Sequence, residues 1–321
     1  MSLDSDCSVL IRCLNEEQHL PVLLTAIRRQ TLQPREIIMV DSGSTDRSIE
    51  IALSYGARVL HIVKEQFSFG KSLNVGFEAA ESPYVVIASA HVYPVHERWL
   101  ELLVENFDAD TAVALVYGGQ TGDHRTNFSE RQIFKQWFPP VSSSDQAHSF
   151  CNNANAAVRR EVWEKLRYDE QVPGLEDVHW AKRAIERGLK ITYRADATVA
   201  HVHEESYRQV YRRYRREAIG LRTVFPWEGM TLLQVVSLYA GAVRADLKQA
   251  RREGILARVL GSVFRFRASQ YWGAYRGLNG RHFMTSELRT RLYYPSSHEE
   301  KAETAAAVAT PPRPAAQKDV D

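Results

Sequence analysis

The residues best suited to chemistry stand where short apolar segments end. Residues 85–89, VVIAS, are predicted to form a buried strand, and His91 follows two positions later. Ligands of α/β sheets bind in the crevice at the carboxyl ends of the strands. An imidazole at that place is suited to chemistry, metal binding included.

A second candidate site follows another apolar segment, in VDSGSTD. Asp41 ends the predicted strand, Ser42-Gly43-Ser44 form a turn, and Ser44 or Thr45 is predicted to cap a helix whose first amides attract anions. An ordinary strand–turn–helix junction, with Asp46 as a capping residue, would have the same sequence pattern. This segment alone therefore leaves nucleotide binding and simple capping both open.

Two adjacent carboxylates make the third candidate, in GLEDVHWAKR. Glu176 and Asp177 begin a predicted helix, where acidic side chains favour the helix dipole. Capping explains one carboxylate. The second fits better with a site that needs a general base.

The fourth candidate is the histidine pair in AHVHEES. His201 and His203 are two residues apart, so they lie on the same side if the strand continues. Such a pair can bind metal, and with His91 it could form a zinc site of the kind that hydrolases use. Buried or solvated histidines without a metal remain the alternative.

The first half of the chain must position these residues, and it alternates strand and helix patterns. Helices of this length between β-branched strands indicate an α/β fold with a doubly wound, mostly parallel sheet. Predicted strands are CSVLIRCL, EIIMVDSGS, ARVLHIV and YVVIASA; predicted helices are NEEQHLPVLLTAIRRQ, TDRSIEIALSYG and GKSLNVGFEAA.

The second half is less regular. CNNANAAVRREVWEKL and GLEDVHWAKRAIERG are predicted to be helical, with KITYR and ATVAHVH as a pair of strands. Three parts are predicted: a catalytic domain over residues 1–222, a helical appendage over 223–295 and a disordered tail over 296–321. The appendage mixes arginines with aromatic residues, which suits either a helix at an anionic membrane surface or a core helix.

Composition excludes several classes of protein. The chain has 321 residues, 44% of them hydrophobic and 25% charged, and a formal net charge of +2, which argues against nucleic acid as a partner. Three cysteines cannot form a closed disulfide framework, so a reducing, cytoplasmic compartment is expected. Neither a secretory signal nor an apolar run long enough to span a bilayer is expected.

In order and spacing, these segments resemble the family 2 glycosyltransferases, which are inverting enzymes with the GT-A fold, and especially the rhamnosyltransferase-like members. The resemblance covers residues 7–222. It implies that Asp177 deprotonates the acceptor with Glu176 beside it. It also implies that the nucleotide-sugar is bound by Asn15, Glu16, Asp41, Ser42, Lys71, Asn74 and Ser89.

One departure from that family affects the metal site. Where the family has Asp-x-Asp after the fourth strand, this chain has Ser89-Ala90-His91. Because imidazole also binds metal, His91 is predicted to take the role of the second aspartate, with His203 or His201 completing the protein's share. The predicted cofactor is a divalent cation, Mn²⁺ or Mg²⁺.

The predicted function is transfer of a hexosyl or deoxyhexosyl group from a nucleotide-sugar to a hydroxyl of a glycan or lipid-linked glycan, in the synthesis of a surface polysaccharide. The enzyme is expected in the cytoplasm, with peripheral binding to the inner face of the membrane as an option. The alternative is a nucleotide-sugar-binding protein that has lost catalysis, in which Ser89 and His91 are remnants of a metal site.

Overall fold

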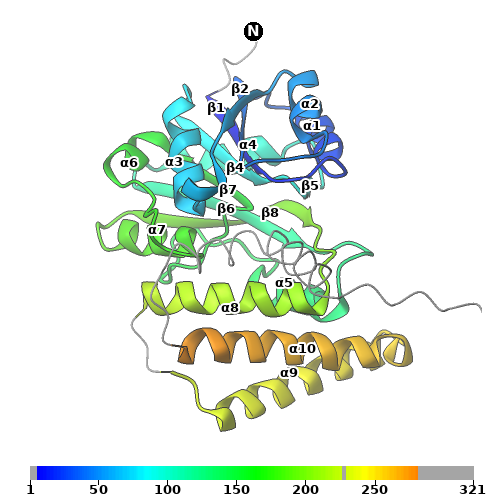
Figure 1. The fold of residues 1–321 in the computed structure, drawn as a ribbon. Helices are drawn as coiled ribbons and strands as arrows, with labels where there is room; N and C mark the ends of the chain where they lie inside the picture. Colours follow the sequence, from blue (N-terminus) through cyan, green and yellow to red (C-terminus); the bar gives the residue numbers. More distant parts are fainter. Residues whose placement is uncertain (1–5, 226–228, 281–321) are drawn as a thin grey trace, which may run out of the picture. The chain divides into compact units, whose positions relative to one another are not determined.

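The fold centres on one eight-stranded mixed sheet. A computed structural model describes residues 6–225 and 229–280, and the sheet has the strand order β3-β2-β1-β4-β7-β6-β8-β5 (Figure 1). Four neighbouring strand pairs are parallel and three are antiparallel. The predicted α/β fold is therefore confirmed, and its sheet is parallel in one half and mixed in the other.

The parallel half follows the sequence pattern closely. Its strands are β1 (Cys7–Cys13), β2 (Glu36–Asp41), β3 (Arg58–His61) and β4 (Tyr84–Ser89). Helices α1 (Leu20–Arg28), α2 (Ser48–Ser54) and α3 (Phe69–Ala79) connect them, with the short 3₁₀ helix η1 (Lys64–Gln66) before α3. Because these strands are parallel, their carboxyl ends meet at one edge of the sheet.

The other half contains two corrections to the sequence prediction. The segment predicted as one helix from Cys151 begins instead with strand β7 (Asn155–Arg159), and only then forms α6 (Arg160–Lys165). Small buried residues let β7 lie between β4 and β6, antiparallel to both. The predicted strand pair near residue 195 is a single strand, β8 (Lys190–His201), which follows β6 through an irregular register.

The remaining elements complete the sheet and its cover. Strand β5 (Val92–Pro94) pairs with the end of β8, and β6 spans Val113–Thr121. The helices are α4 (Trp99–Ala109), α5 (Phe128–Trp137), α7 (Glu176–Ile185), α8 (Tyr207–Val224), α9 (Leu232–Arg252) and α10 (Leu256–Asn279).

Helices α8 and α10 pack against each other closely. At Gly277 an added Cβ would lie 2.5 Å from the carbonyl oxygen of Arg215, so only glycine allows this approach of the two backbones. The predicted boundary at residue 222 stays a prediction, and the predicted tail lies outside the described residues. In the part of the chain that is described, no helix combines the length and the apolar character that crossing a bilayer requires.

Candidate active site

The carboxyl edge of the sheet gathers most of the predicted residues. Asn15 and Glu16 follow β1, Asp41 ends β2, and Ser89 ends β4. Strand β8 ends at His201, which pairs with Val92 of β5. The register of parallel strands, with residue 12 opposite Ser89, therefore brings segments far apart in the chain to one edge.

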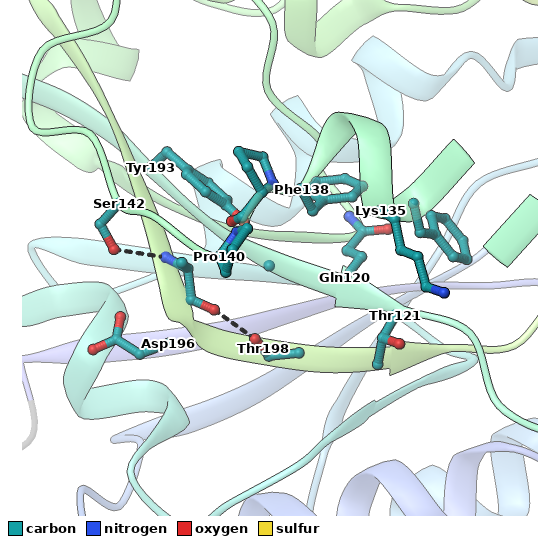
Figure 2. Close-up of a pocket in the computed structure, with 13 residues that line it drawn as sticks. Gln120, Thr121, Lys135, Phe138, Pro140, Ser142, Tyr193, Asp196 and Thr198 are labelled. Atoms are coloured by element: carbon teal, nitrogen blue, oxygen red, sulfur yellow. Dashed lines mark hydrogen bonds between the residues drawn. The ribbon is translucent and has the colours of Figure 1, made fainter. Parts of the chain in front are cut away.

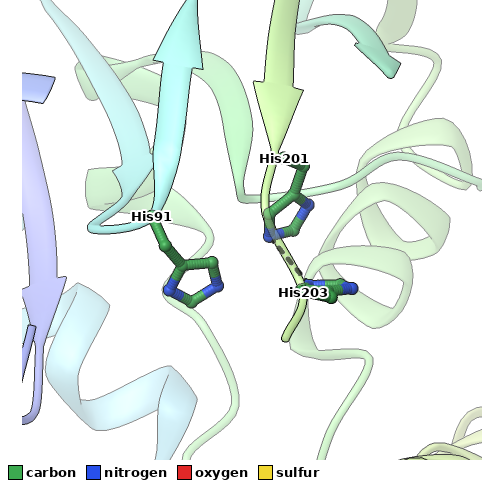
Figure 3. Close-up of side chains that lie close together, drawn as sticks. All are labelled: His91, His201 and His203. Atoms are coloured by element: carbon green, nitrogen blue, oxygen red, sulfur yellow. Dashed lines mark hydrogen bonds between the residues drawn. The ribbon is translucent and has the colours of Figure 1, made fainter. Parts of the chain in front are cut away.

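Three histidines form a cluster at this edge. His91 comes from the turn between β4 and β5, and His201 and His203 come from the end of β8 (Figure 3). Each histidine has a ring nitrogen that could bind a metal, and these three nitrogens all lie within 4.8 Å of one another. The Nε2 atoms of His201 and His203 are 3.0 Å apart. The predicted histidine trio is therefore brought together.

Each histidine is oriented by an oxygen atom at Nδ1. His91 Nδ1 lies 2.8 Å from Glu16 Oε1, a contact the sequence could not indicate. His201 Nδ1 lies 2.8 Å from Gln120 Oε1, and His203 Nδ1 lies 2.7 Å from Glu130 Oε1. Oxygen acceptors at Nδ1 place the proton there and leave Nε2 with its lone pair, which is the usual arrangement behind metal-binding histidines.

The cluster fits a divalent cation. Burial first, and then the neighbouring imidazoles and Arg213, hold the pKa of His201 well below its usual value, so this imidazole is neutral near pH 7. Two Nε2 lone pairs facing each other at 3.0 Å repel unless a proton or a cation lies between them. Imidazole donors favour Mn²⁺ over Mg²⁺, which prefers oxygen ligands.

A buried arginine network supports His203 from behind. Burial by itself raises the pKa of Glu130, but Arg213 and then His203, which both contact its carboxylate, outweigh burial and lower the pKa to about 2. Arg213 also contacts Glu205, with 2.7 Å between nitrogen and oxygen. Glu130 therefore remains ionised under His203 at any pH relevant to activity.

The two adjacent carboxylates lie buried at the start of α7. Glu176 accepts a hydrogen bond from Arg12 of β1, with 3.0 Å between the atoms. Asp177 accepts hydrogen bonds from the backbone amides of Asn153 and Val178. Because Ser89 N donates to the carbonyl of Ala154, the backbone that anchors Asp177 adjoins the end of β4.

The environment of Asp177 raises its pKa. Burial is the largest cause and the charge of Glu176 is the second, and together they raise the pKa to about 7. The two backbone amides and Arg12 act in the opposite direction with less effect. A carboxyl group poised near neutral pH is what a general base requires.

Asp41 holds the turn after β2 together. Its carboxylate accepts hydrogen bonds from the amides of Gly43 and Ser44, and its side chain is buried. Gly43 has φ of +101°, which glycine adopts readily. The predicted cap at Ser44 or Thr45 is wrong, because α2 begins only at residue 48, where Asp46 accepts from the amide.

Asn15 ties this turn to β1. Its side-chain oxygen accepts a hydrogen bond from the amide of Thr45, and its own amide donates to the hydroxyl of Ser44. Asn15 has φ of +55°, a left-handed conformation that asparagine tolerates. Ser42 is buried, and its hydroxyl donates to the carbonyl of Cys13. The outer side of this loop, with Asn15 and Thr45, is exposed.

The two predicted donor-binding residues of α3 differ in how accessible they are to a ligand. The ammonium of Lys71 contacts the side chain of Gln66 and remains partly exposed. Asn74 is buried. Its side-chain nitrogen donates hydrogen bonds to the carbonyl of Tyr168 and to the carboxylate of Glu170, and its side-chain oxygen accepts from the indole of Trp163 and the amide of Tyr168. All its hydrogen-bonding groups are therefore used within the protein, which gives Asn74 a structural role, and its predicted contact with the donor stays a prediction.

A hollow beside the histidines contains none of the predicted residues. Its volume is about 610 Å³, and Gln120, Lys135, Phe138, Ser142, Tyr193 and Asp196 are among the residues that line it (Figure 2). Ser142 accepts from the amide of Ala195, and Thr198 donates to the carbonyl of Ala195. Gln120 and Phe134 line this hollow and also contact His201 of the cluster. The candidate active site is therefore at the strand ends and not in this hollow.

Residues 8–167 match the profile of glycosyl transferase family 2. The chain belongs to this family. An O-antigen chain rhamnosyltransferase of Salmonella anatum is 32% identical over 200 residues, which are 59% of this chain and 63% of that protein. An O-antigen chain rhamnosyltransferase of Salmonella typhimurium is 27% identical over 220 residues, which are 64% of this chain and 69% of that protein. The match thus spans less than two thirds of the Salmonella anatum relative.

Solved structures of the GT-A fold resemble this family 2 chain. A mannosyltransferase from Pyrobaculum calidifontis, in complex with GDP-Man and Mn²⁺, has a TM-score of 0.57 and 18% identity over 86% of this chain and 88% of that chain. Glucosyl-3-phosphoglycerate synthase from Mycobacterium tuberculosis, in complex with Mn²⁺ and UDP-Glc, has a TM-score of 0.52 and 20% identity over 68% of this chain and 79% of that chain. At such identities the likeness shows the fold alone.

Several residues of this family 2 site escaped prediction. Arg12, Gln120, Glu130 and Arg213 hold the predicted side chains in place, yet their partners are 73 to 164 residues away in the chain. A glutamine or a glutamate inside an ordinary strand or helix has no local signal. The single hint was Arg213, which lies in the arginine-rich helix after the histidines.

Proposed function

We propose that this chain transfers a sugar from a nucleotide-sugar to a hydroxyl group of a glycan or lipid-linked glycan, with inversion at the anomeric carbon. The observation that carries the proposal is Asp177, a buried carboxyl with a pKa near 7 at the same sheet edge as the histidine cluster. Family membership makes sugar transfer the reaction for which such a base is needed.

The base has one task in this reaction. As the acceptor oxygen bonds to the anomeric carbon and the bond from that carbon to the diphosphate oxygen breaks, the hydroxyl proton passes to a carboxylate oxygen of Asp177. The two amide donors from Asn153 and Val178 fix the orientation of that carboxylate. The negative charge of Glu176, which forms an ion pair with Arg12, raises the basicity of Asp177. Attack from the side opposite the diphosphate gives inversion.

The histidine cluster is the proposed place for a divalent cation, Mn²⁺ rather than Mg²⁺. His91, His201 and His203 would hold it, and Ser89, whose hydroxyl lies 3.1 Å from His91 Nε2, adjoins the same space. When bound, the cation supplies positive charge to the leaving diphosphate. The three imidazoles add no negative charge, so the full charge of the ion remains available to phosphate oxygens.

The donor is proposed to lie along the ends of β1, β2 and β4. The turn held by Asp41, the loop of Asn15 and Glu16, and Ser42 would face the nucleoside, with Lys71 reaching toward the donor from α3. Because the Asp41 carboxylate already accepts two amides within the turn, it shapes this site more than it contacts the base or ribose.

The acceptor is the least determined part of the proposal. The Salmonella relatives are named as O-antigen chain rhamnosyltransferases, which supports a deoxyhexosyl donor and a growing surface polysaccharide as acceptor. Such a role places the enzyme in the cytoplasm, where nucleotide-sugars are available.

A donor panel tests the proposal. UDP-, dTDP- and GDP-sugars, each with and without Mn²⁺, are screened by thermal shift, because a ligand bound to the folded state raises the melting temperature. We expect one nucleotide class to give the largest shift, and only with the ion. NMR of the product formed with that donor should show the inverted anomeric configuration. Retention, or no shift with any donor, would contradict the proposal.

A further inference from the structure

Helix α9 has one face without a partner in the described part of the chain. Figure 1 shows α10 between α8 and α9. The buried residues of α9 are Val235, Val243, Asp246 and Ala250, which lie on one side of the helix. The opposite side is exposed along the whole length of α9.

Large apolar side chains are exposed at the start of α9. Leu233 is 83% exposed, Val236 is 61% exposed, and Leu232 and Leu238 are also exposed. On α10, Leu260, Phe264 and Trp272 are exposed as well. Seven of the thirteen exposed large apolar side chains in the described residues therefore lie on these two helices, a concentration that marks an interaction surface.

The same two helices carry a strong positive charge. Residues 229–280 contain eight arginines and lysines and only two acidic residues, in a chain whose net charge is +2. Of the two acids, Asp246 is buried in an ion pair with Arg267, and Glu253 lies 3.6 Å from Lys135. The exposed basic residues are Arg244, Lys248, Arg251, Arg252, Arg258, Arg265 and Arg276.

Apolar and basic residues share the outer face of α9. At 100° per residue, Leu233 and Arg251 point in the same direction, and Arg244 lies close to that line. Leu233 stands at one end of this outer face, and Arg244, Lys248 and Arg251 follow toward the other end. A face with an exposed apolar end and a row of cations along the rest can contact acyl chains and anionic headgroups at the same time.

We propose that the outer face of α9 binds the surface of an anionic lipid bilayer. Leu233, with the exposed Val236 beside it, would enter the boundary between headgroups and acyl chains, and the basic residues farther along would contact anionic headgroups. Charge complementarity favours this occupant over a second copy of the chain, because two positive faces repel each other. This inference does not depend on the proposed sugar transfer.

Sedimentation with vesicles tests the proposal on the full chain. Vesicles of 70% phosphatidylcholine and 30% phosphatidylglycerol should retain the wild type, whereas phosphatidylcholine alone should not. Each basic residue near an anionic surface contributes roughly fivefold in binding, so Arg244→Gln/Lys248→Gln/Arg251→Gln should weaken partitioning by roughly 100-fold. Leu233→Ser/Val236→Ser should weaken binding to the same vesicles and leave its salt dependence in place.

Matched control variants remove the same kinds of side chain at other places on the surface. Arg29→Gln/Lys165→Gln/Arg187→Gln removes three exposed charges, and Val22→Ser/Leu53→Ser removes two exposed apolar side chains. Both controls should bind vesicles like the wild type, and circular dichroism should show that all variants are folded. If the α9 charge variant and its control lost vesicle binding equally, the binding would depend on net charge alone, and the proposal would be overturned.

Other occupants would give different results. A second copy of the chain would appear as a dimer that Leu233→Ser/Val236→Ser dissociates, with no vesicle binding. A general polyanion surface would bind duplex DNA as tightly as vesicles, and the apolar variant would leave that binding unchanged. Either outcome would overturn the lipid proposal, as would a wild type that stays in solution with anionic vesicles.

Discussion

The histidine cluster and the Glu176–Asp177 pair occupy the same edge of the sheet, and burial acts on them in opposite directions. It lowers the pKa of His201 and raises the pKa of Asp177 to about 7. In both places burial disfavours the charged form. The imidazole is therefore neutral and free to bind a cation, and the carboxyl is close to the point where it can accept a proton.

Glu130 shows that burial alone does not decide the result. It is as buried as Asp177, yet its pKa is lowered to about 2 because Arg213 and His203 face it. Asp177 has the charge of Glu176 as its neighbour instead. The sign of the adjacent charge thus separates a carboxylate that orients a histidine from a carboxyl that can exchange a proton.

The largest expected effect is at Asp177. Asp177→Asn removes the base but keeps the shape, so turnover should fall by roughly 10²-fold or more while donor affinity is unchanged. Rates are measured at saturating donor, and affinity is measured by calorimetry. Glu186→Gln, at the exposed end of the same helix, is the control and should retain full turnover. Wild-type turnover in Asp177→Asn would remove this residue from the mechanism.

The next effect sharpens the role of the histidine supports. Glu130→Gln weakens the acceptor behind His203, so the affinity for Mn²⁺ should fall by roughly 10- to 100-fold. Calorimetric titration of the ion measures it, in the presence of the nucleoside diphosphate. Glu204→Gln changes an exposed glutamate next to the cluster and should bind Mn²⁺ like the wild type. Equal affinity in both variants would show that Glu130 has a structural role only.

The sequence predicted the motifs but not their supports. The parallel strands, the adjacent carboxylates and the histidine pair carry local signals, because each is a short run of letters at a strand or helix end. The structural role of Asn74 could not be predicted, because its partners, from Trp163 to Glu170, come about 90 residues later in the chain. Strand β7 was predicted as helix because Asn155–Arg159 is rich in alanine, which fits a helix by propensity and a crowded central strand by size.

Asp41 should affect stability as well as ligand binding. Asp41→Ala leaves the amides of Gly43 and Ser44 without their acceptor, so the free energy of unfolding should fall by about 1–3 kcal/mol. Denaturant titration measures this change. Asp46→Ala, which removes the acceptor at Ser48, offers a comparison in the same loop. An unchanged free energy of unfolding would mean that the turn does not depend on Asp41.

The smallest expected effect is a shift in pH dependence. Asp177 is a base only when ionised, so turnover should decline as the pH falls below about 7. The charge of Glu176 raises the pKa of Asp177, so Glu176→Gln should move this decline to lower pH. Profiles of turnover against pH at saturating substrates measure the shift. A decline that stays in place, or moves to higher pH, would show that Glu176 does not tune the base.

The response to metal tests most directly whether the histidine cluster binds the cation. Mn²⁺ binding in the presence of the nucleoside diphosphate, followed by electron paramagnetic resonance, should show nitrogen coupling in the wild type, and turnover should stop in excess chelator and return best with Mn²⁺. His91→Ala should lose this response, and His91→Asp should regain it with a shift toward Mg²⁺. Full turnover in excess chelator, with no nitrogen coupling to bound Mn²⁺, would contradict the account and leave arginine and lysine to neutralise the diphosphate.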